Sequence, residues 1–326
     1  MPSARKYVGL DVGGTTMKAA VVNDAGKASK AVAMDTQPER GQQHGLETMG
    51  ETIRRAVAAA KLTMDDIAAI GVATPGLGDI RAGVILDPPN LKPWRNVPVR
   101  DFIQKLFNKP TAYQNDANAA AFGESWVGAG RGSNSMVMFT LGTGVGGGII
   151  VGNRIIEGEH SHGGELGHLR IDMPDRGRLC GCGARGCLEA YASASAVTKR
   201  AREELASWRG PTALKSYATA NEDEFTAKMI FDIAAAGDAC AQKVVDDTAY
   251  YLALGACAAI AVVDPEMIVI GGGMVAAGEP FRKQIDEYIR RYGLPYPMKK
   301  VKVAFAELGS DAGFIGAAGC ARMLGK

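Results

Sequence analysis

The sequence predicts an α/β fold of two domains, and three features of the chain support this. Short strands rich in β-branched residues alternate with helical segments, an order typical of α/β proteins. A strand–glycine–strand unit at residues 7–22 recurs at residues 136–151, which indicates a duplicated architecture. The length of 326 residues, at roughly 150 residues per domain, leaves room for two domains.

The individual elements follow from hydrophobic spacing and turn residues. We expect strands at residues 7–12, 17–22, 28–34, 67–73, 111–114, 136–141, 149–151, 267–270 and 301–305. We expect helices at residues 46–60, from residue 99, at residues 117–127 and from residue 314. The stretch from the cysteines at 180–187 to residue 261 should also be mostly helical.

Composition and charge exclude several classes of protein. Hydrophobic residues make up 47% and charged residues 22%, which is the ordinary globular range and excludes a disordered or fibrous chain. The 37 Lys and Arg against 35 Asp and Glu give a net charge of +2, with no run of either sign. This balance disfavours a nucleic-acid partner, which usually requires a basic face.

No segment indicates export or membrane insertion. Residues 1–10 lack the apolar stretch of a signal peptide. The longest apolar run, residues 250–263, has 14 residues, too few to span a bilayer, and reads as a buried core helix. Six cysteines without an export signal argue against a disulfide framework. We therefore expect a cytoplasmic protein with no membrane partner.

Glycine is the one compositional anomaly. The chain has 42 glycines, about 13% of its residues against about 7% in average proteins, and they fall in clusters. The chain has no P-loop string, Gly-x-x-x-x-Gly-Lys-Ser/Thr. The dinucleotide fingerprint does not fit either, because the pattern after Gly13 and Gly14 is a strand and not a helix. One such hairpin is compatible with a simple tight turn. Two hairpins and a third run at residues 271–273 favour phosphate and nucleotide binding.

A cluster of soft ligands indicates zinc. His168, Cys180, Cys182 and Cys187 supply a complete tetrahedral set within a short segment. Four protein ligands leave no open position, so we expect a structural ion. Buried free thiols are the alternative, and His160 or His162 could replace His168 as a ligand.

Carboxylates near these motifs are candidates for acid–base chemistry. Asn115 and Asp116 lie where a strand meets a helix, the usual place for sites in α/β folds. Asp116 is either a general base or a helix N-cap, since Asp is among the best capping residues. Glu165 and Glu189 flank the cysteine–histidine set, and each alone would be an ordinary surface acid.

Taken together, these strings resemble the ROK family, which contains sugar kinases and sugar-responsive repressors of the actin-like ATPase superfamily. Residues 10–15 (LDVGGT) match its first phosphate motif, residues 142–148 (GTGVGGG) its second, and residues 271–273 its run on the adenosine side. The cysteine–histidine set resembles the family's zinc motif. The similarity covers nearly the whole chain, and residues 186–193 (GCLEAYAS) resemble the bacterial glucokinases of the family.

The resemblance implies roles for the matching residues. Asp116 would take the proton from the sugar 6-hydroxyl, and Asp11 would hold magnesium directly or through water. The other sugar contacts would come from Gly76, Asn115, Glu165, His168 and Glu189. ATP would be bound by Gly13, Gly14, Thr15, Gly142, Thr143, Gly144, Gly271, Gly272 and Gly273. Many relatives have a lysine where this chain has Thr16, so Thr16 and the nearby Lys18 receive no role.

The resemblance also implies a fold and an activity. The fold would be the two-domain actin-like ATPase (ribonuclease H-like) fold with an interdomain cleft. Residues 1–115 plus 313–326 would form a small domain, and residues 116–312 a large domain carrying the zinc loop. The activity would be ATP-dependent phosphorylation of glucose to glucose 6-phosphate, a step of glycolysis, with Mg²⁺ and structural Zn²⁺, in a homo-oligomer of two or four chains.

Three alternatives to this interpretation stand beside it. An N-acetylmannosamine or N-acetylglucosamine kinase would share the same strings, because selectivity at the sugar 2-position depends on loops. Polyphosphate is an alternative phosphoryl donor. A sugar-sensing repressor would need a helix-turn-helix region of about 60 residues before the kinase body. The first phosphate motif begins near Asp11, which disfavours that function.

Overall fold

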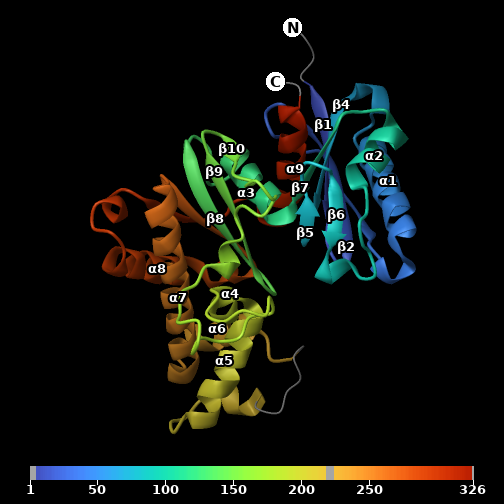
Figure 1. The fold of residues 1–326 in the computed structure, drawn as a ribbon. Coiled ribbons are helices and arrows are strands. Elements are labelled where there is room, and N and C mark those ends of the chain that lie inside the picture. Colours follow the sequence, from blue (N-terminus) through green and yellow to red (C-terminus); the bar gives the residue numbers. More distant parts are fainter. Residues whose placement is uncertain (1–4, 218–223, 325–326) are drawn as a thin grey trace. The chain divides into compact units, whose positions relative to one another are not determined.

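Two five-stranded mixed sheets form the framework of the chain (Figure 1). The computed structural model describes residues 5–217 and 224–324, which divide into two units. The first unit comprises residues 1–134, 148–164 and 307–326, and the second comprises residues 135–147 and 165–306. The strand orders, β3-β2-β1-β4-β7 and β10-β9-β8-β11-β12, repeat the same pattern. The expected α/β fold and its internal repeat are therefore confirmed.

The first unit is built on the sheet that begins at the N-terminus. Its strands are β1 Lys6–Val12, β2 Thr16–Asn23, β3 Val32–Asp35, β4 Ile67–Thr74 and β7 Thr111–Asn115, with a separate hairpin of β5 Leu77–Asp79 and β6 Val84–Asp87. Its helices are α1 Gln42–Ala59, α2 Val99–Phe107, α3 Asp116–Val127 and α9 Ala312–Met323. Strands β1, β4 and β7 are parallel, so their carboxyl ends share one edge of the sheet.

Helices cover both faces of this sheet. Apolar residues of α1 and α2 pack on one face, around the fully buried Trp94, and α9 packs on the other face (Figure 1). The approach of α9 is unusually close because two strand residues are glycines. A Cβ atom at Gly9 would lie 1.8 Å from the Phe314 carbonyl oxygen, and one at Gly71 would lie 1.8 Å from that of Ala317. These glycines let the last helix lie directly on the first strands.

A buried carboxylate holds residues 307 and 308, where the chain re-enters the first unit. Glu124 of α3 is fully buried, and its oxygens accept hydrogen bonds from the backbone N–H groups of Ala129, Glu307 and Leu308. Three N–H donors compensate the charge of a buried carboxylate. The segment before α9 is thereby held against α3.

The second unit combines the other sheet with a helical layer. Its strands are β8 Ser135–Leu141, β9 Val145–Val151, β11 Met267–Gly272 and β12 Lys302–Phe305, and the sheet ends in β10 Arg154–Ile155. The division between the units passes through β9. The helices are α4 Glu189–Ala192, α5 Ala194–Ser207, α6 Ala227–Ala235, α7 Ala239–Val263 and α8 Gly278–Tyr292.

Helix α7 is the central helix of the second unit. Within the described ranges it is the one helix long and apolar enough to span a membrane. It packs against α5, α6 and α8, and residues such as Leu252, Ala256 and Ile260 are buried there. These contacts are those of a core helix, as expected for residues 250–263.

The compact units do not coincide with the expected division into residues 1–115 plus 313–326 and residues 116–312. Helix α3 packs against α9 and so joins the first unit, as do residues 148–164. Sequence analysis also missed the short strands β5, β6 and β10 and the helix α8. The signal for α8 was present, since Phe281, Ile285 and Ile289 recur at helical spacing and are all buried.

Candidate active site

Asp11 lies at the carboxyl end of β1, against the first turn of α9. A Cβ atom at Gly313 would lie 2.2 Å from Asp11 Oδ2, so the carboxylate fills the space that a side chain there would need. Burial, reinforced by the charge of Asp116, raises the pKa of Asp11 to about 7, while the charge of Lys18 acts to lower it. Lys18 is the cross-strand partner of Asp11 and forms an ion pair with Asp311, with 2.5 Å between Nζ and Oδ1.

The first glycine turn is a braced hairpin between β1 and β2. The Gly13 N–H donates to the Thr16 carbonyl at 2.9 Å. Thr36 holds the turn from the side, since its hydroxyl donates to the Gly13 carbonyl at 2.7 Å and its N–H to the Thr15 carbonyl at 2.8 Å. Thr15 itself is exposed, so its hydroxyl is available to a ligand.

Asn115, and not Asp116, caps helix α3. The Asn115 side-chain oxygen accepts hydrogen bonds from the N–H groups of Ala117 at 2.9 Å and Asn118 at 3.2 Å. Asp116 is the first residue of the helix, and its carboxylate also accepts from the Ala117 N–H, at 2.7 Å. The capping interpretation of Asp116 therefore loses its main support, because its neighbour makes the cap.

Gly76 turns the chain beside Asn115. Its φ of +82° is a conformation that favours glycine, and a Cβ atom there would lie 2.8 Å from the Pro88 Cα atom. The Asn115 side-chain amide donates to the Gly76 carbonyl at 3.5 Å. Gly76, Asn115 and Asp116 thus lie at the carboxyl ends of two adjacent parallel strands, β4 and β7, at the same sheet edge.

The second glycine turn, between β8 and β9, is held by the chain that follows the cysteine loop. The Gly142 N–H donates to the Gly144 carbonyl at 3.0 Å, and the Ala194 N–H donates to the Gly142 carbonyl at 2.9 Å. Glu189 accepts the Val145 N–H at 3.0 Å through Oε2. Thr143 at the tip is exposed.

A cavity of about 350 Å³ opens beside this turn, within the second unit. Its walls are mostly apolar and come from the turn, helix α6 and the segment after β11. The lining residues are Leu141, Gly142, Thr143, Ala194, Thr226, Ala227, Lys228, Phe231, Asp232, Gly273, Met274, Ala276 and Ala277. Of the predicted ATP residues, Gly142, Thr143 and Gly273 line it. Gly144, Gly271 and Gly272 do not.

Sequence analysis missed the α6 wall of this cavity. Thr226 caps α6 by accepting the Met229 N–H, and Lys228 pairs with Asp232 at 2.6 Å. A cap and an i,i+4 pair are ordinary features of helices, so nothing in the sequence marked them as part of a site. Gly271 and Gly272 instead allow the end of β11 to lie close to β8. A Cβ atom at Gly272 would lie 2.3 Å from the Leu141 carbonyl oxygen.

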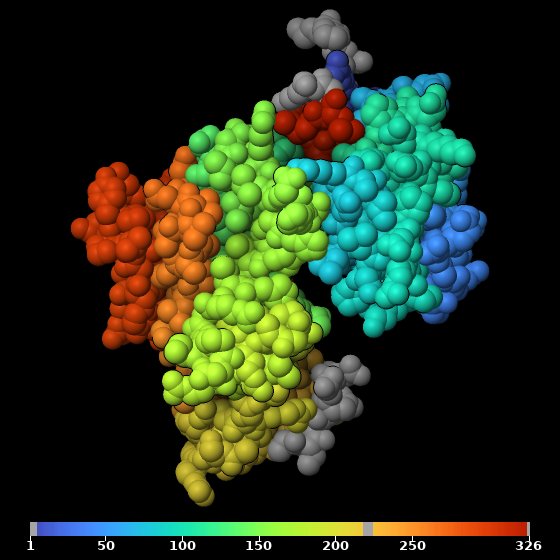
Figure 2. Space-filling model, in the orientation of Figure 1, coloured from blue at the N-terminus to red at the C-terminus, as the bar shows by residue number. Residues whose placement is uncertain are grey.

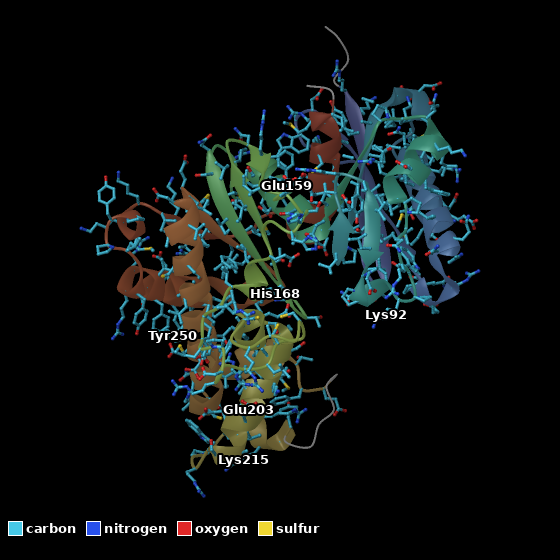
Figure 3. All side chains as sticks on the ribbon, in the orientation of Figure 1. Lys92, Glu159, His168, Glu203, Lys215 and Tyr250 are labelled. Atoms are coloured by element: carbon cyan, nitrogen blue, oxygen red, sulfur yellow. The ribbon has the colours of Figure 1, made fainter. Side chains whose placement is uncertain are left out.

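The four predicted zinc ligands come together in the second unit. One ligand atom from each of His168, Cys180, Cys182 and Cys187 lies within 4.8 Å of the others. The Cys182 and Cys187 sulfur atoms are 3.7 Å apart, and Cys180 Sγ is 3.9 Å from His168 Nδ1. Figure 3 shows the sulfur atoms beside His168.

These distances fit a tetrahedral metal site. Zinc–sulfur bonds of about 2.3 Å at tetrahedral angles place two sulfur atoms about 3.8 Å apart, whereas a disulfide would require about 2.05 Å. Burial raises the pKa of the Cys180 thiol to about 12, and this thiol would have to lose its proton to bind a metal. Three cysteine sulfurs and one imidazole nitrogen form the donor set of a structural zinc site.

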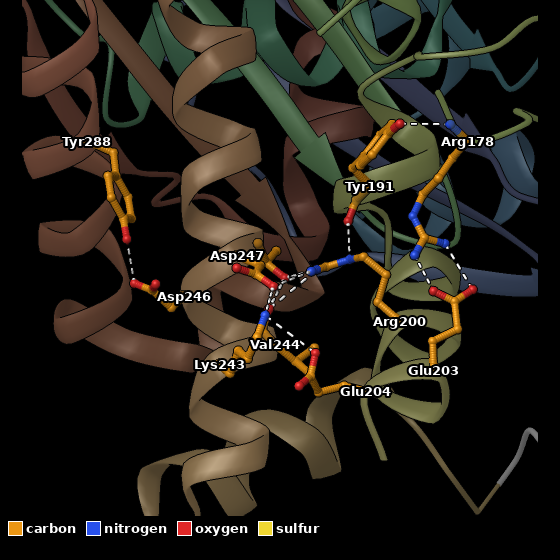
Figure 4. A network of polar contacts seen from close by, with 11 residues as sticks. Arg178, Tyr191, Arg200, Glu203, Glu204, Lys243, Val244, Asp246, Asp247 and Tyr288 are labelled. Atoms are coloured by element: carbon orange, nitrogen blue, oxygen red, sulfur yellow. Dashed lines mark hydrogen bonds and ion pairs between the residues drawn. The ribbon is translucent and has the colours of Figure 1, made fainter. Parts of the chain in front are cut away.

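A network of polar contacts anchors the cysteine loop to the helical layer (Figure 4). The Tyr191 hydroxyl accepts the Arg178 N–H at 2.7 Å and donates to Asp172 at 2.5 Å. Arg178 pairs with Glu203, and the buried Arg200 donates to the Tyr191 carbonyl at 3.0 Å. These contacts fix the loop to α5 without involving His168 or the three cysteines.

Glu189 connects the cysteine set to the second glycine turn. Its Oε1 lies 3.5 Å from Cys180 Sγ, while Oε2 accepts the Val145 N–H. Glu165 is exposed directly before the short helix Leu166–His168, and the His168 N–H donates to its carbonyl. Glu165, His168 and Glu189 thus gather around one loop of the second unit, as Asp11, Asn115 and Asp116 gather at one sheet edge of the first.

Comparison with known proteins identifies the family. Residues 7–323 match the ROK family. The chain belongs to the ROK family. A glucokinase of Halalkalibacterium halodurans is 36% identical to this ROK protein over 314 residues, covering 96% of this chain and 94% of the relative. The resemblance drawn from the motifs is therefore confirmed.

Solved structures of the family agree with the fold. The ROK hexokinase of Thermus thermophilus is 34% identical, with a TM-score of 0.82 and 98% coverage of both chains. A ROK family glucokinase of Streptomyces griseus, solved in complex with glucose and AMPPNP, is 32% identical, with a TM-score of 0.78 and coverage of 98% and 99%. The expected actin-like ATPase fold is confirmed by this similarity.

The cysteine set of this ROK protein gives a first prediction. We expect the purified protein to carry about one zinc ion per chain, and Cys182→Ser to carry only a small fraction of that, because a hydroxyl is a poor zinc ligand. Metal analysis of the purified protein measures this directly. Cys257→Ser, in α7 and away from the cluster, is the control and should keep its zinc. Active wild-type protein without zinc would contradict the assignment.

The raised pKa of Asp11 gives a second prediction, for Asp11→Asn measured without nucleotide or Mg²⁺. The folded protein retains the Asp11 proton up to about pH 7 while the unfolded chain loses it near pH 4. Ionisation therefore opposes folding increasingly from about pH 4 to about pH 7, and constantly above that range. Asp11→Asn should raise the melting temperature at pH 8, by about 2–4 °C for each kcal/mol gained in the free energy of unfolding. The increase should be smaller at pH 5.

The exposed Asp65 provides the matched control, since Asp65→Asn should leave the melting temperature unchanged at both pH values. If the melting temperature of Asp11→Asn at pH 8 is at or below that of wild type, burial of the Asp11 carboxylate does not destabilise the folded protein, and the prediction is wrong.

Proposed function

We propose that this protein transfers the γ-phosphoryl group of ATP to the 6-hydroxyl of glucose. One observation carries the proposal: Asp11 and Asp116 lie at the carboxyl ends of two strands of the same parallel set, Asp11 within β1 and Asp116 directly after β7, close enough for the charge of Asp116 to raise the pKa of Asp11. The edge where parallel strands end is where α/β proteins bind ligands. Two carboxylates there suit one proton acceptor and one cation ligand.

Asp116 is the general base of the proposed reaction. Its carboxylate takes the proton of the sugar 6-hydroxyl while that oxygen forms a bond to the γ-phosphorus and the bond from phosphorus to ADP breaks. Because Asn115 supplies the helix cap, the Asp116 side chain is not needed for that purpose. The rigid start of α3 holds it in place. A positioned base of this kind contributes about 10²–10⁴-fold to a rate.

The donor phosphates are bound by main-chain N–H groups and hydroxyls. The exposed Thr15 and Thr143 lie at the tips of two braced glycine turns. Phosphoryl transfer needs positioning and charge stabilisation more than covalent chemistry, and such turns supply both. Asp11 fits Mg²⁺, since a cation would offset the charge of two neighbouring carboxylates. Bound Mg²⁺ would neutralise negative charge on the phosphates.

The cavity beside the second turn suits the nucleoside of ATP. Its volume of about 350 Å³ lies within the usual range for small-molecule sites, and its walls are mostly apolar. A purine would bury its faces there, whereas polyphosphate, being anionic throughout, would gain nothing from apolar walls. This favours ATP over polyphosphate as the donor.

Asn115, Glu165, His168 and Glu189 are the proposed partners of the remaining sugar hydroxyls. Zinc would hold one nitrogen of the His168 ring and so fix the direction of the other. Glucose is proposed as the acceptor because relatives at 35–36% identity carry the name glucokinase. The proposed setting is carbohydrate metabolism in the cytoplasm, with a protein of two or four identical chains.

The acceptor is tested by a third prediction. In a coupled assay of ADP release with ATP, glucose should give the highest kcat/KM among glucose, mannose, fructose, N-acetylmannosamine and N-acetylglucosamine, with mannose slower. Replacing ATP with polyphosphate should abolish sugar phosphorylation. A preference for either N-acetylhexosamine would assign the protein to that class of sugar kinase instead.

The base is tested by a fourth prediction. Asp116→Asn keeps the size of the side chain and an oxygen that accepts the Ala117 N–H, but it cannot take up the proton. Its kcat should fall by about 10²-fold or more, while the melting temperature and the Kd for glucose change little. Asn118→Ala, two residues along the same helix, controls for disturbance of α3. Wild-type turnover in Asp116→Asn would exclude the base role, and Glu165 would be tested next.

A further inference from the structure

Gln114 is a buried polar residue that the proposed mechanism leaves without a role. It is the next-to-last residue of β7, directly before Asn115 and Asp116, and only 2% of it is exposed. Buried glutamines are rare unless their amide groups are fully hydrogen-bonded. The contacts of this side chain show what it holds together.

Both ends of the Gln114 amide are used. Its nitrogen donates to Glu157 Oε1 at 2.8 Å, and its oxygen accepts the Asn115 backbone N–H at 2.8 Å. A continuous chain of hydrogen bonds therefore runs from Glu157 through Gln114 to Asn115. The bond to a carboxylate is charge-assisted and is the stronger kind.

Glu157 belongs to a segment, residues 156–164, that is fastened to the first unit at several points. The Ile80 N–H donates to the Ser161 hydroxyl at 3.0 Å, and Arg81 pairs with Glu159 through two bonds of 2.9 Å. Figure 3 labels Glu159, and Figure 2 shows this segment lying against the β5–β6 hairpin. The segment runs directly into Glu165.

We infer that Gln114 and Glu157 form a positioning pair for the acceptor sugar. The pair fixes the backbone of Asn115, and through it the first turn of α3 with Asp116, and it ties this turn to the segment that leads to Glu165. Gln114 touches neither sugar nor phosphate and is a positioning residue. The inference rests on the proposed function, because it assumes that Asn115 and Asp116 meet the sugar.

The chemistry of the pair allows a sharp test, because its two groups can be exchanged. Gln114→Glu keeps the acceptor for the Asn115 N–H but sets a carboxylate against Glu157. The double variant Gln114→Glu with Glu157→Gln restores one carboxylate and one amide, with the donor now at 157. Charge is conserved in the exchange, and both hydrogen bonds can form again.

The expected results are kinetic. Gln114→Glu should lower kcat/KM for glucose about tenfold or more, since small displacements of reacting groups carry large rate costs, and leave the KM for ATP within about twofold. The exchanged double variant should recover to within about threefold of wild type. Glu159→Gln loses the exposed ion pair on the same segment and should behave as wild type, because such pairs contribute about 0–1 kcal/mol.

Several outcomes would overturn the inference. Gln114→Glu with a lowered melting temperature but wild-type kinetics would make Gln114 a purely structural residue. A double variant as impaired as Gln114→Glu would show that the pairing does not matter. If Gln114→Glu does not fold, Glu157→Met removes the partner acceptor at a half-buried position, and unchanged glucose kinetics there would be equally decisive. Failure of the proposed function is seen separately, as wild-type protein that phosphorylates no sugar.

Discussion

The close contact between the last helix and the first strands is the constraint on which the first unit depends. Helix α9 lies on β1 and β4 at a distance that only glycine permits, at Gly9 and Gly71. The same contact places Gly313 against the Asp11 carboxylate and removes water from it, which raises the pKa of Asp11. The electrostatics of the candidate site are therefore set by the far end of the chain. A single added methyl group at Gly313 would have to displace the carboxylate itself.

The candidate site residues could be predicted from sequence alone because they lie in short, recognisable strings. Gly13, Gly14 and the cysteine set are recognisable from residue type and spacing, and the strands and helices around them follow from local hydrophobic period. Most of what the sequence could not show depends on contacts between distant segments. Both α6 as a cavity wall and the pairing of Gln114 with Glu157 require knowing which segments meet. The cap at Asn115 is a local contact, but Asn and Asp cap helices about equally well, so the residue types alone do not distinguish Asn115 from Asp116. Strands of two or three residues, such as β10, are likewise fixed by their neighbours and carry almost no local signal.

At the junction of β7 with α3, three adjacent residues have three different roles. Gln114 points into the interior and fixes the backbone, Asn115 caps the helix, and Asp116 occupies the first helical position. Each role has a different chemical requirement: an amide with both a donor and an acceptor, a short side chain with a carbonyl oxygen, and a carboxylate. Since an N-cap must accept from the helix, a carboxylate in that position would be committed to backbone N–H groups. With the cap at Asn115, the start of the helix does not depend on Asp116, although its carboxylate still accepts the Ala117 N–H.

In the second unit, contacts between loops hold the candidate residues in place. Glu189 contacts Cys180 with one oxygen and the glycine turn with the other, so the cysteine set is linked directly to the turn that carries Thr143. The loop is held further by Tyr191, Arg178 and Arg200, whose contacts end in α5 and α7. A loop rich in glycine has many conformations to lose on folding, and the polar network restricts them from the side of α5 and α7. A metal bound by the four ligands would restrict the loop at a second place and would help to fix the positions of Glu165, His168 and Glu189.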